Sequence, residues 1–255
     1  MKYKPLLLSS LGLIPAGMHP AAAAPPNVKP PQTIQYVPSW AGYYVGVNLG
    51  AVSEYSSATT FLPNAPFSYC FSGSCGFSNR PTAIGVLGGG QIGYNFQTGD
   101  WVYGLETDFD FASARHTTTG ADTYAFAGNW TARTGIQDLG TVRLRLGYTF
   151  DRALIYATGG LAYGKVSDNF QAGNSGGATY NWSGDPGWRT GYTVGGGLEY
   201  ALSQSLSIKG EGLFYDLGTK NEFTVLPVGA NFGVTGVADH MNGVVGRIGL
   251  NYHFQ

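Results

Sequence analysis

The chain has an uneven composition: its 255 residues include 40 glycines, 14% are aromatic, and only 11% are Asp, Glu, Lys or Arg. Soluble domains carry roughly 25% charged residues. The formal net charge of −1 gives no electrostatic indication of a nucleic-acid-binding protein. The glycines follow no collagen period, and the aromatic content argues against disorder. The composition therefore favours aromatic-rich β-structure.

The first 23 residues have the three parts of a secretory signal peptide. Lys2 and Lys4 precede an apolar stretch from Leu6 to Ile14, and small residues follow at 21–24. The apolar stretch is shorter than the ~20 residues of a membrane-spanning helix, and Pro15 interrupts it. We therefore expect residues 1–23 to direct export and to be cleaved off.

Residues 24–39 contain five prolines and are predicted to form an extended periplasmic linker. The remaining residues, 40–255, hold no stretch apolar enough for a transmembrane helix. An exported chain of this kind can enter a membrane only as a closed barrel. Residues 40–255 are therefore predicted to be an outer-membrane β-barrel.

A repeat runs through this barrel region. Similar segments end at Tyr94, Tyr148, Tyr200 and Tyr252, which are 54, 52 and 52 residues apart. A fixed period of this length indicates a repeated supersecondary unit. The unit predicted here is two strands with two connections.

Eight strands are predicted, at 42–53, 83–97, 101–113, 138–150, 153–165, 189–202, 205–217 and 242–254. Three connections are tight (98–100, 151–152 and 203–205), and four are long, near 54–82, 114–137, 166–188 and 218–241. Outer-membrane barrels alternate short periplasmic turns with long extracellular loops and have an even number of strands. The expected fold is all-β: an eight-stranded antiparallel up-and-down transmembrane β-barrel with both ends in the periplasm.

Side chains alternate in character along these strands. Val142, Leu144 and Leu146 share one face of their strand, and Arg143 and Arg145 lie on the other. A soluble sandwich would turn the apolar face inward, whereas a membrane barrel turns it to lipid. The alternation alone does not distinguish a soluble sandwich from a membrane barrel. The signal peptide, the aromatic strand ends and the alternating connection lengths favour the barrel.

In a barrel, nine charged side chains would point into the lumen. Most lie five to eight residues from the nearest periplasmic turn or terminus, which is near mid-membrane at ~3.3 Å per residue. Acids and bases at one height can pair with each other; the alternative is that they simply keep charge away from lipid. The nine residues are Glu106, Asp108, Asp110, Glu199 and Glu211 with Arg143, Arg145, Lys209 and Arg247.

The first long connection contains Cys70 and Cys75. Because an exported protein folds in an oxidising compartment, we expect them to form a disulfide, with two unpaired thiols as the alternative. The histidines have no metal-ligand spacing, so no metal site is expected. Capture of haem or a metal by His116 and His240, both predicted in long loops, is a secondary hypothesis. No cofactor is expected either, because the Gly-rich match at 88–93 continues as a strand where a dinucleotide site needs a helix.

Several segments together resemble alphaproteobacterial outer-membrane barrels of the RopB type. They are Trp40–Gly50, 88–96, Tyr156–Gly164, Glu211–Gly218 and Arg247–Phe254. The resemblance covers the strands of nearly the whole mature chain and fails in the loops. It implies a small porin-like or OmpA-like barrel at the surface of a Gram-negative cell, without catalytic residues to carry over. Barrels of this family usually end with the aromatic residue that the assembly machinery recognises, whereas here Gln255 follows Phe254.

The sequence thus predicts a structural or surface-interacting outer-membrane protein with little or no open channel. The partners expected are outer-membrane lipid and lipopolysaccharide, the barrel assembly machinery, and host or surface ligands bound through the long loops, but not nucleic acid. The alternatives are a small-solute porin, a surface barrel that binds haem or another ligand, and an enzyme acting on lipid. The enzyme would need a Ser/His or Asp/His pair near the outer membrane edge. No such pair is readable within one strand, so no enzyme is expected.

Overall fold

A computed structural model of the protein describes residues 38–61, 78–79, 82–122, 128–173, 179–183, 187–228 and 231–254. All of them belong to one compact unit, residues 37–255. In these ranges we find no helix of the length and apolarity needed to cross a membrane. The predicted signal peptide, most of the predicted linker, and both cysteines lie outside the described residues, so these expectations stay predictions.

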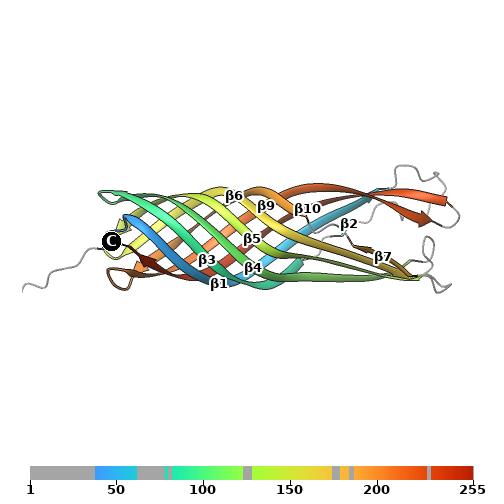
Figure 1. Ribbon diagram of the computed structural model, residues 1–255, viewed down its shortest axis with the longest axis horizontal. Coiled ribbons are helices and arrows are strands. Elements are labelled where there is room, and N and C mark those ends of the chain that lie inside the picture. The colour runs from blue at the N-terminus through green and yellow to red at the C-terminus, as the bar shows by residue number, and fades with distance from the viewer. Residues whose placement is uncertain are drawn as a thin grey trace, which may run out of the picture. The chain divides into compact units, whose positions relative to one another are not determined.

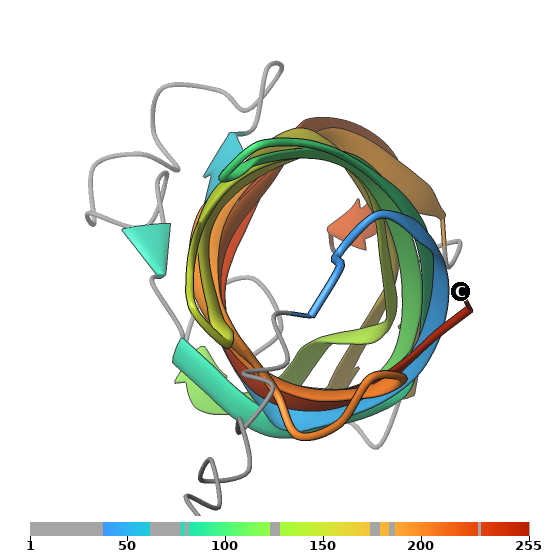
Figure 2. The ribbon, with the colours of Figure 1, turned by 90° about the vertical axis from the view of Figure 1, so that its left-hand side faces the viewer.

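Eight long strands form a closed antiparallel barrel, as predicted. They are β1 (Gly42–Phe61), β3 (Thr82–Thr98), β4 (Trp101–Asp122), β5 (Gly128–Phe150), β6 (Ala153–Gly173), β8 (Trp188–Ala201), β9 (Leu206–Val228) and β10 (Asn231–His253). Neighbours in the wall follow chain order, and β1 pairs with β10 to close the ring (Figures 1 and 2). The short β2 (Ser78–Asn79) pairs with β1, and β7 (Thr179–Ser183) pairs with β6. Closure leaves no unpaired edge in the wall, which a lipid environment requires.

One end of the barrel, called here the turn end, carries the short connections and the C-terminus (Figure 1). Gly99 and Asp100 join β3 to β4, and Asp151 and Arg152 join β5 to β6. Gly99 and Asp151 have φ angles of +61° and +53°, in the left-handed region that two-residue hairpin turns use. The third predicted turn is longer than expected, because residues 202–205 all lie outside the strands.

The opposite end, the hairpin end, departs from the prediction. β4 and β5 stay paired as far as Asp122 and Gly128, and β9 and β10 as far as Val228 and Asn231. Most of the predicted connections at 114–137 and 218–241 are therefore strand, as are parts of 54–82 and 166–188. The loop prediction was wrong there because it treated polar sequence as loop. Beyond the lipid both faces of a hairpin meet water, so polar residues on both faces are compatible with strand.

The two faces of the wall differ as the alternation predicts. The outward Leu144, Phe111 and Ile248 expose 70%, 68% and 63% of their surface, whereas Arg143, the neighbour of Leu144 in β5, is fully buried. Aromatic rings gather on the outward face toward both ends of the apolar band. The contacting pairs are Tyr43–Tyr94, Tyr94–Phe96, Trp101–Tyr148 and Tyr252–Phe254 at the turn end, and Phe109–Phe111, Tyr163–Trp188 and Tyr192–Phe214 toward the hairpin end. An apolar belt between two aromatic girdles is the outer surface of a membrane barrel.

The turn at Asp151 generates a test of local strain. We expect Asp151→Asn and Asp151→Gly to leave the free energy of unfolding within about 0.5 kcal/mol of the wild type, because both residues tolerate a positive φ. Asp151→Val should lower it by about 1–2 kcal/mol, since a β-branched side chain is strained there. Urea unfolding in phospholipid vesicles measures the difference. Equal stability of the Val and Asn variants would contradict this conformation of the turn.

Candidate functional site

The candidate site is the barrel interior, where the structure places all nine of the charged residues named above. None of the nine is more than 6% exposed. The antiparallel register sets opposite charges directly opposite each other in three pairs of strands. These cross-strand pairs are Glu106 with Arg143, Glu199 with Lys209, and Glu211 with Arg247. Charges from separate strands therefore meet inside the ring.

The nine buried charges and their hydrogen-bond partners are called here the ionic layer. Glu106 on β4 lies at its centre. Lys209 Nζ is 3.0 Å from each of its two carboxylate oxygens, and Arg143 forms an ion pair with Oε1. The Tyr44 hydroxyl donates a hydrogen bond of 2.7 Å to Oε2. One carboxylate thus joins β1, β4, β5 and β9 across the lumen.

Arg247 on β10 extends the layer toward the hairpin end. Its guanidinium lies 2.6 Å from Asp110, 2.8 Å from Asp108 and 2.7 Å from Glu211. Arg143 shares two of these acids, at 2.9 Å from Asp108 and 2.9 Å from Glu211. Two arginines and three acids therefore form one continuous set of charge-assisted hydrogen bonds, which are the stronger kind.

Arg145 forms the part of the layer nearest the turn end. It pairs with Glu199, and its guanidinium carbon lies 3.7 Å from the centre of the Tyr156 ring. Such a desolvated cation–π contact adds to the ion pair. Glu199 also accepts a hydrogen bond of 2.7 Å from Asn251, which in turn accepts one of 2.6 Å from Gln91 on β3. With Tyr156 on β6, every wall strand contributes to the ionic layer.

Two apolar layers enclose the ionic layer, and the sequence analysis missed both. The layer toward the hairpin end is formed by buried side chains of seven strands: Val52, Ala83, Leu87, Ala114, Ile136, Leu139, Ala162, Val166, Leu213, Tyr215, Leu217, Met241 and Val245. The layer at the turn end is formed by Trp40, Val102, Leu154, Tyr156 and Ala201. These inward apolar residues were overlooked because the prediction assigned apolar positions to the lipid face and considered only charges for the lumen.

Trp40 closes the turn end from a position ahead of β1. The chain before β1 bends into the ring (Figure 2), and the Trp40 amide donates a hydrogen bond of 2.8 Å to Gln97 Oε1. The indole is 2% exposed and meets the His253 ring edge-on, with 5.6 Å between centroids. A residue outside the wall strands therefore contributes to filling the lumen.

The two histidines of the secondary hypothesis lie in strands, not in loops. His116 is in β4, and His240 is in β10, where it lies 3.5 Å from Asp216 and 3.1 Å from Thr219. Within the described ranges, no three His, Cys, Asp or Glu side chains are arranged to hold a metal ion. Cys70 and Cys75 fall outside those ranges, and their disulfide stays a prediction.

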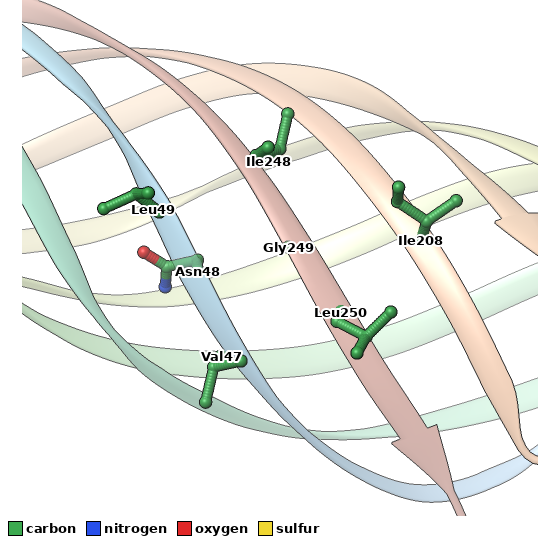
Figure 3. A pocket seen from close by; sticks show the side chains of 7 residues that line it. All are labelled: Val47, Asn48, Leu49, Ile208, Ile248, Gly249 and Leu250. Atoms are coloured by element: carbon green, nitrogen blue, oxygen red, sulfur yellow. The ribbon is translucent and has the colours of Figure 1, made fainter.

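A shallow hollow of about 240 Å³ lies on β1, β9 and β10 (Figure 3). Its apolar lining is Val47, Leu49, Ile208, Ile248 and Leu250, around Gly249 and beside Asn48. The five apolar side chains are exposed on the outward face. The hollow is thus part of the lipid-facing surface and contains no group with catalytic chemistry.

Comparison with known proteins gives consistent matches. A family model described as the outer membrane protein beta-barrel domain matches residues 11–254. The 31 kDa outer-membrane immunogenic protein of Brucella melitensis is 37% identical over 219 residues, covering 85% of this chain and 84% of that protein. The 22 kDa outer membrane protein of Rhizobium leguminosarum is 32% identical over 137 residues, 52% of this chain and 54% of that protein. The crystal structure of OprG from Pseudomonas aeruginosa aligns with a TM-score of 0.48 and 12% identity, covering 84% and 97% of the two chains.

The ionic layer generates a test of stability. Arg145→Ala leaves Glu199 buried without its cation, so we expect a loss of about 3–5 kcal/mol in the free energy of unfolding. Arg152→Ala is the matched control, because Arg152 lies in the β5–β6 turn, where it donates a hydrogen bond of 3.3 Å to the Leu202 carbonyl and its guanidinium carbon lies 6.0 Å from the centre of the Tyr200 ring. The control should lose no more than about 1 kcal/mol. Urea unfolding in vesicles measures both variants, and equal losses would contradict a special role for the buried pair.

Proposed function

The chain belongs to the family of outer membrane protein beta-barrel domains. We propose that it is a closed, non-conducting barrel that acts through its exposed hairpins. The family match, the relatives named as outer-membrane proteins and the lipid-facing wall place it in the cell outer membrane. Short turns face the periplasm in such barrels, so the hairpin end faces out of the cell. Lipid and lipopolysaccharide form its surroundings there.

The layered lumen is the observation that supports closure. Eight strands enclose a space only just wide enough for side chains, whereas aqueous porins need about 16–18 strands. In this barrel the space holds an ionic layer between two apolar layers, and the central Arg143, Lys209 and Glu106 are at most 2% exposed. A solute could pass only by separating buried ion pairs, which leaves uncompensated charge in a water-poor interior.

Planar-bilayer recording tests the proposal. We expect the purified wild-type protein to give no steady conductance, because two apolar layers and the buried ion pairs between them occupy the interior. A 16-stranded porin recorded under the same conditions is the positive control. Steady, large conductance events from the purified monomer would contradict closure and favour the small-solute porin.

The hairpin end is the proposed site of surface interactions. β4–β5 and β9–β10 continue well beyond the aromatic girdle, so they present paired strands outside the lipid. The Brucella relative is named an outer-membrane immunogenic protein, and immune recognition requires an exposed surface. By analogy, we propose that host or surface ligands meet this chain at its hairpin ends, and that the barrel assembly machinery inserts it into the membrane.

Epitope insertion tests this orientation. A tag inserted between Asp122 and Gly128 should be labelled by antibody on intact cells, because that connection lies at the hairpin end. The same tag inserted between Asp151 and Arg152 should be labelled only after the outer membrane is permeabilised. Antibody binding to the second tag on sealed cells would contradict the orientation.

A further inference from the structure

The outward face of β4 and β5 changes character beyond the lipid band. On β4 the outward apolar and aromatic positions run from Trp101 to Phe111, and ten residue steps along a tilted strand span about 25 Å, the height of such a band. Four residues farther on, Arg115 is exposed on the same face, and on β5 Arg133 is exposed as well. Both arginines therefore lie just outside the hydrocarbon, on the side that the orientation proposed above places outside the cell.

The register makes these two arginines neighbours. Arg115 is opposite Gly135, and Arg133 is opposite Thr117, so the arginines occupy diagonal positions on one face, which lie roughly 7–8 Å apart. Gly135 leaves room for this arrangement. A Cβ built at that position would lie 3.0 Å from the Arg115 Cγ, so the Arg115 side chain lies across Gly135 toward β5.

Among the described outward side chains, no acid lies directly beside the pair. Within the described part of the chain neither arginine forms an ion pair, and the described outward positions beside them include Ser113, Thr117, Ser167 and Asn169, the last directly opposite Arg133. Among the side chains that the structure describes on this face, the nearest acid in the register is Asp138, and it lies directly opposite Lys165. Two guanidinium groups thus face the headgroup region with their charge available.

The geometry points to a binding site for the anionic saccharide headgroup of the outer-leaflet glycolipid, formed by Arg115 and Arg133. Guanidinium groups bind phosphate and carboxylate in a bidentate manner, and this headgroup supplies such groups at the height of the pair. Directly below, Phe109 and Phe111 lie edge to face on the same outward surface, at 5.4 Å between centroids. One lipid can therefore place its acyl chains on the two phenylalanines and its charged sugar on the two arginines.

Titration of the purified barrel with lipopolysaccharide in a zwitterionic detergent tests this site. The readout is the temperature at which the folded, fast-migrating gel band is lost, followed against lipopolysaccharide concentration. For the double variant Arg115→Gln/Arg133→Gln the half-saturating concentration should rise at least about fivefold, since two exposed ion pairs of modest strength are removed. The effect in the wild type should weaken at high salt.

Asp138→Asn/Lys165→Gln is the matched control, because it removes two charges from the same wall without changing the net charge. It should bind lipopolysaccharide as the wild type does. Unchanged half-saturation in the arginine variant, or an equal loss in the control, would overturn the site. Equal stabilisation of the wild type by phosphatidylglycerol would overturn the assignment to the glycolipid. The conductance of the barrel has no part in this test, so its result is independent of whether the lumen is closed.

Discussion

A buried charge needs an opposite charge beside it, and in this barrel that requirement fixes the register of the wall. Arg143 is completely buried, and its partner Glu106 is directly opposite it on the neighbouring strand. Because side chains alternate with a period of two, a slip of one residue would turn Arg143 toward the lipid. There an arginine costs about 2–4 kcal/mol, and the acids left inside would lose their cation. The same reasoning applies to Glu211 with Arg247.

The apolar layers explain how so many charges persist in one cross-section. Buried ion pairs are weak sources of stability by themselves, because desolvation offsets much of their attraction. Here the layers around Trp40 and Met241 keep bulk water from both sides of the ionic layer. A low local dielectric strengthens each hydrogen-bonded pair and also raises the penalty for an unpaired one. The layers and the charges therefore depend on each other, and together they favour a single arrangement of strands.

The sequence predicts the membrane-facing half of this architecture better than the rest. Arg143 and Leu144 were assigned to opposite faces because lipid on one side and a polar lumen on the other impose a clear period of two. Ile136 and Ala114 were not assigned to the interior, since hydrophobicity does not distinguish an apolar residue facing lipid from one facing an apolar lumen. Each also borders an irregularity in register that interrupts the alternation, between Phe111 and Ala114 in β4 and between Ile136 and Asp138 in β5.

The contrast between lipid and water also separates the membrane-embedded wall, whose sequence is constrained, from the hairpins beyond it, whose sequence can vary. Inside the bilayer, each side chain faces either the lipid or the filled lumen, and its polarity is constrained by the side that it faces. Beyond Ala114 and Ile136, where the buried apolar layer ends, both faces of β4 are at least partly exposed, so strand pairing continues while the side chains are free to serve recognition. Arg115 and Arg133 lie at the boundary between the membrane-embedded wall and the hairpins. They are close enough to the lipid to reach its headgroups, and they lie outside the depth at which a charged side chain is costly. Recognition chemistry in this barrel is therefore expected to begin at that boundary and to extend outward along the hairpins.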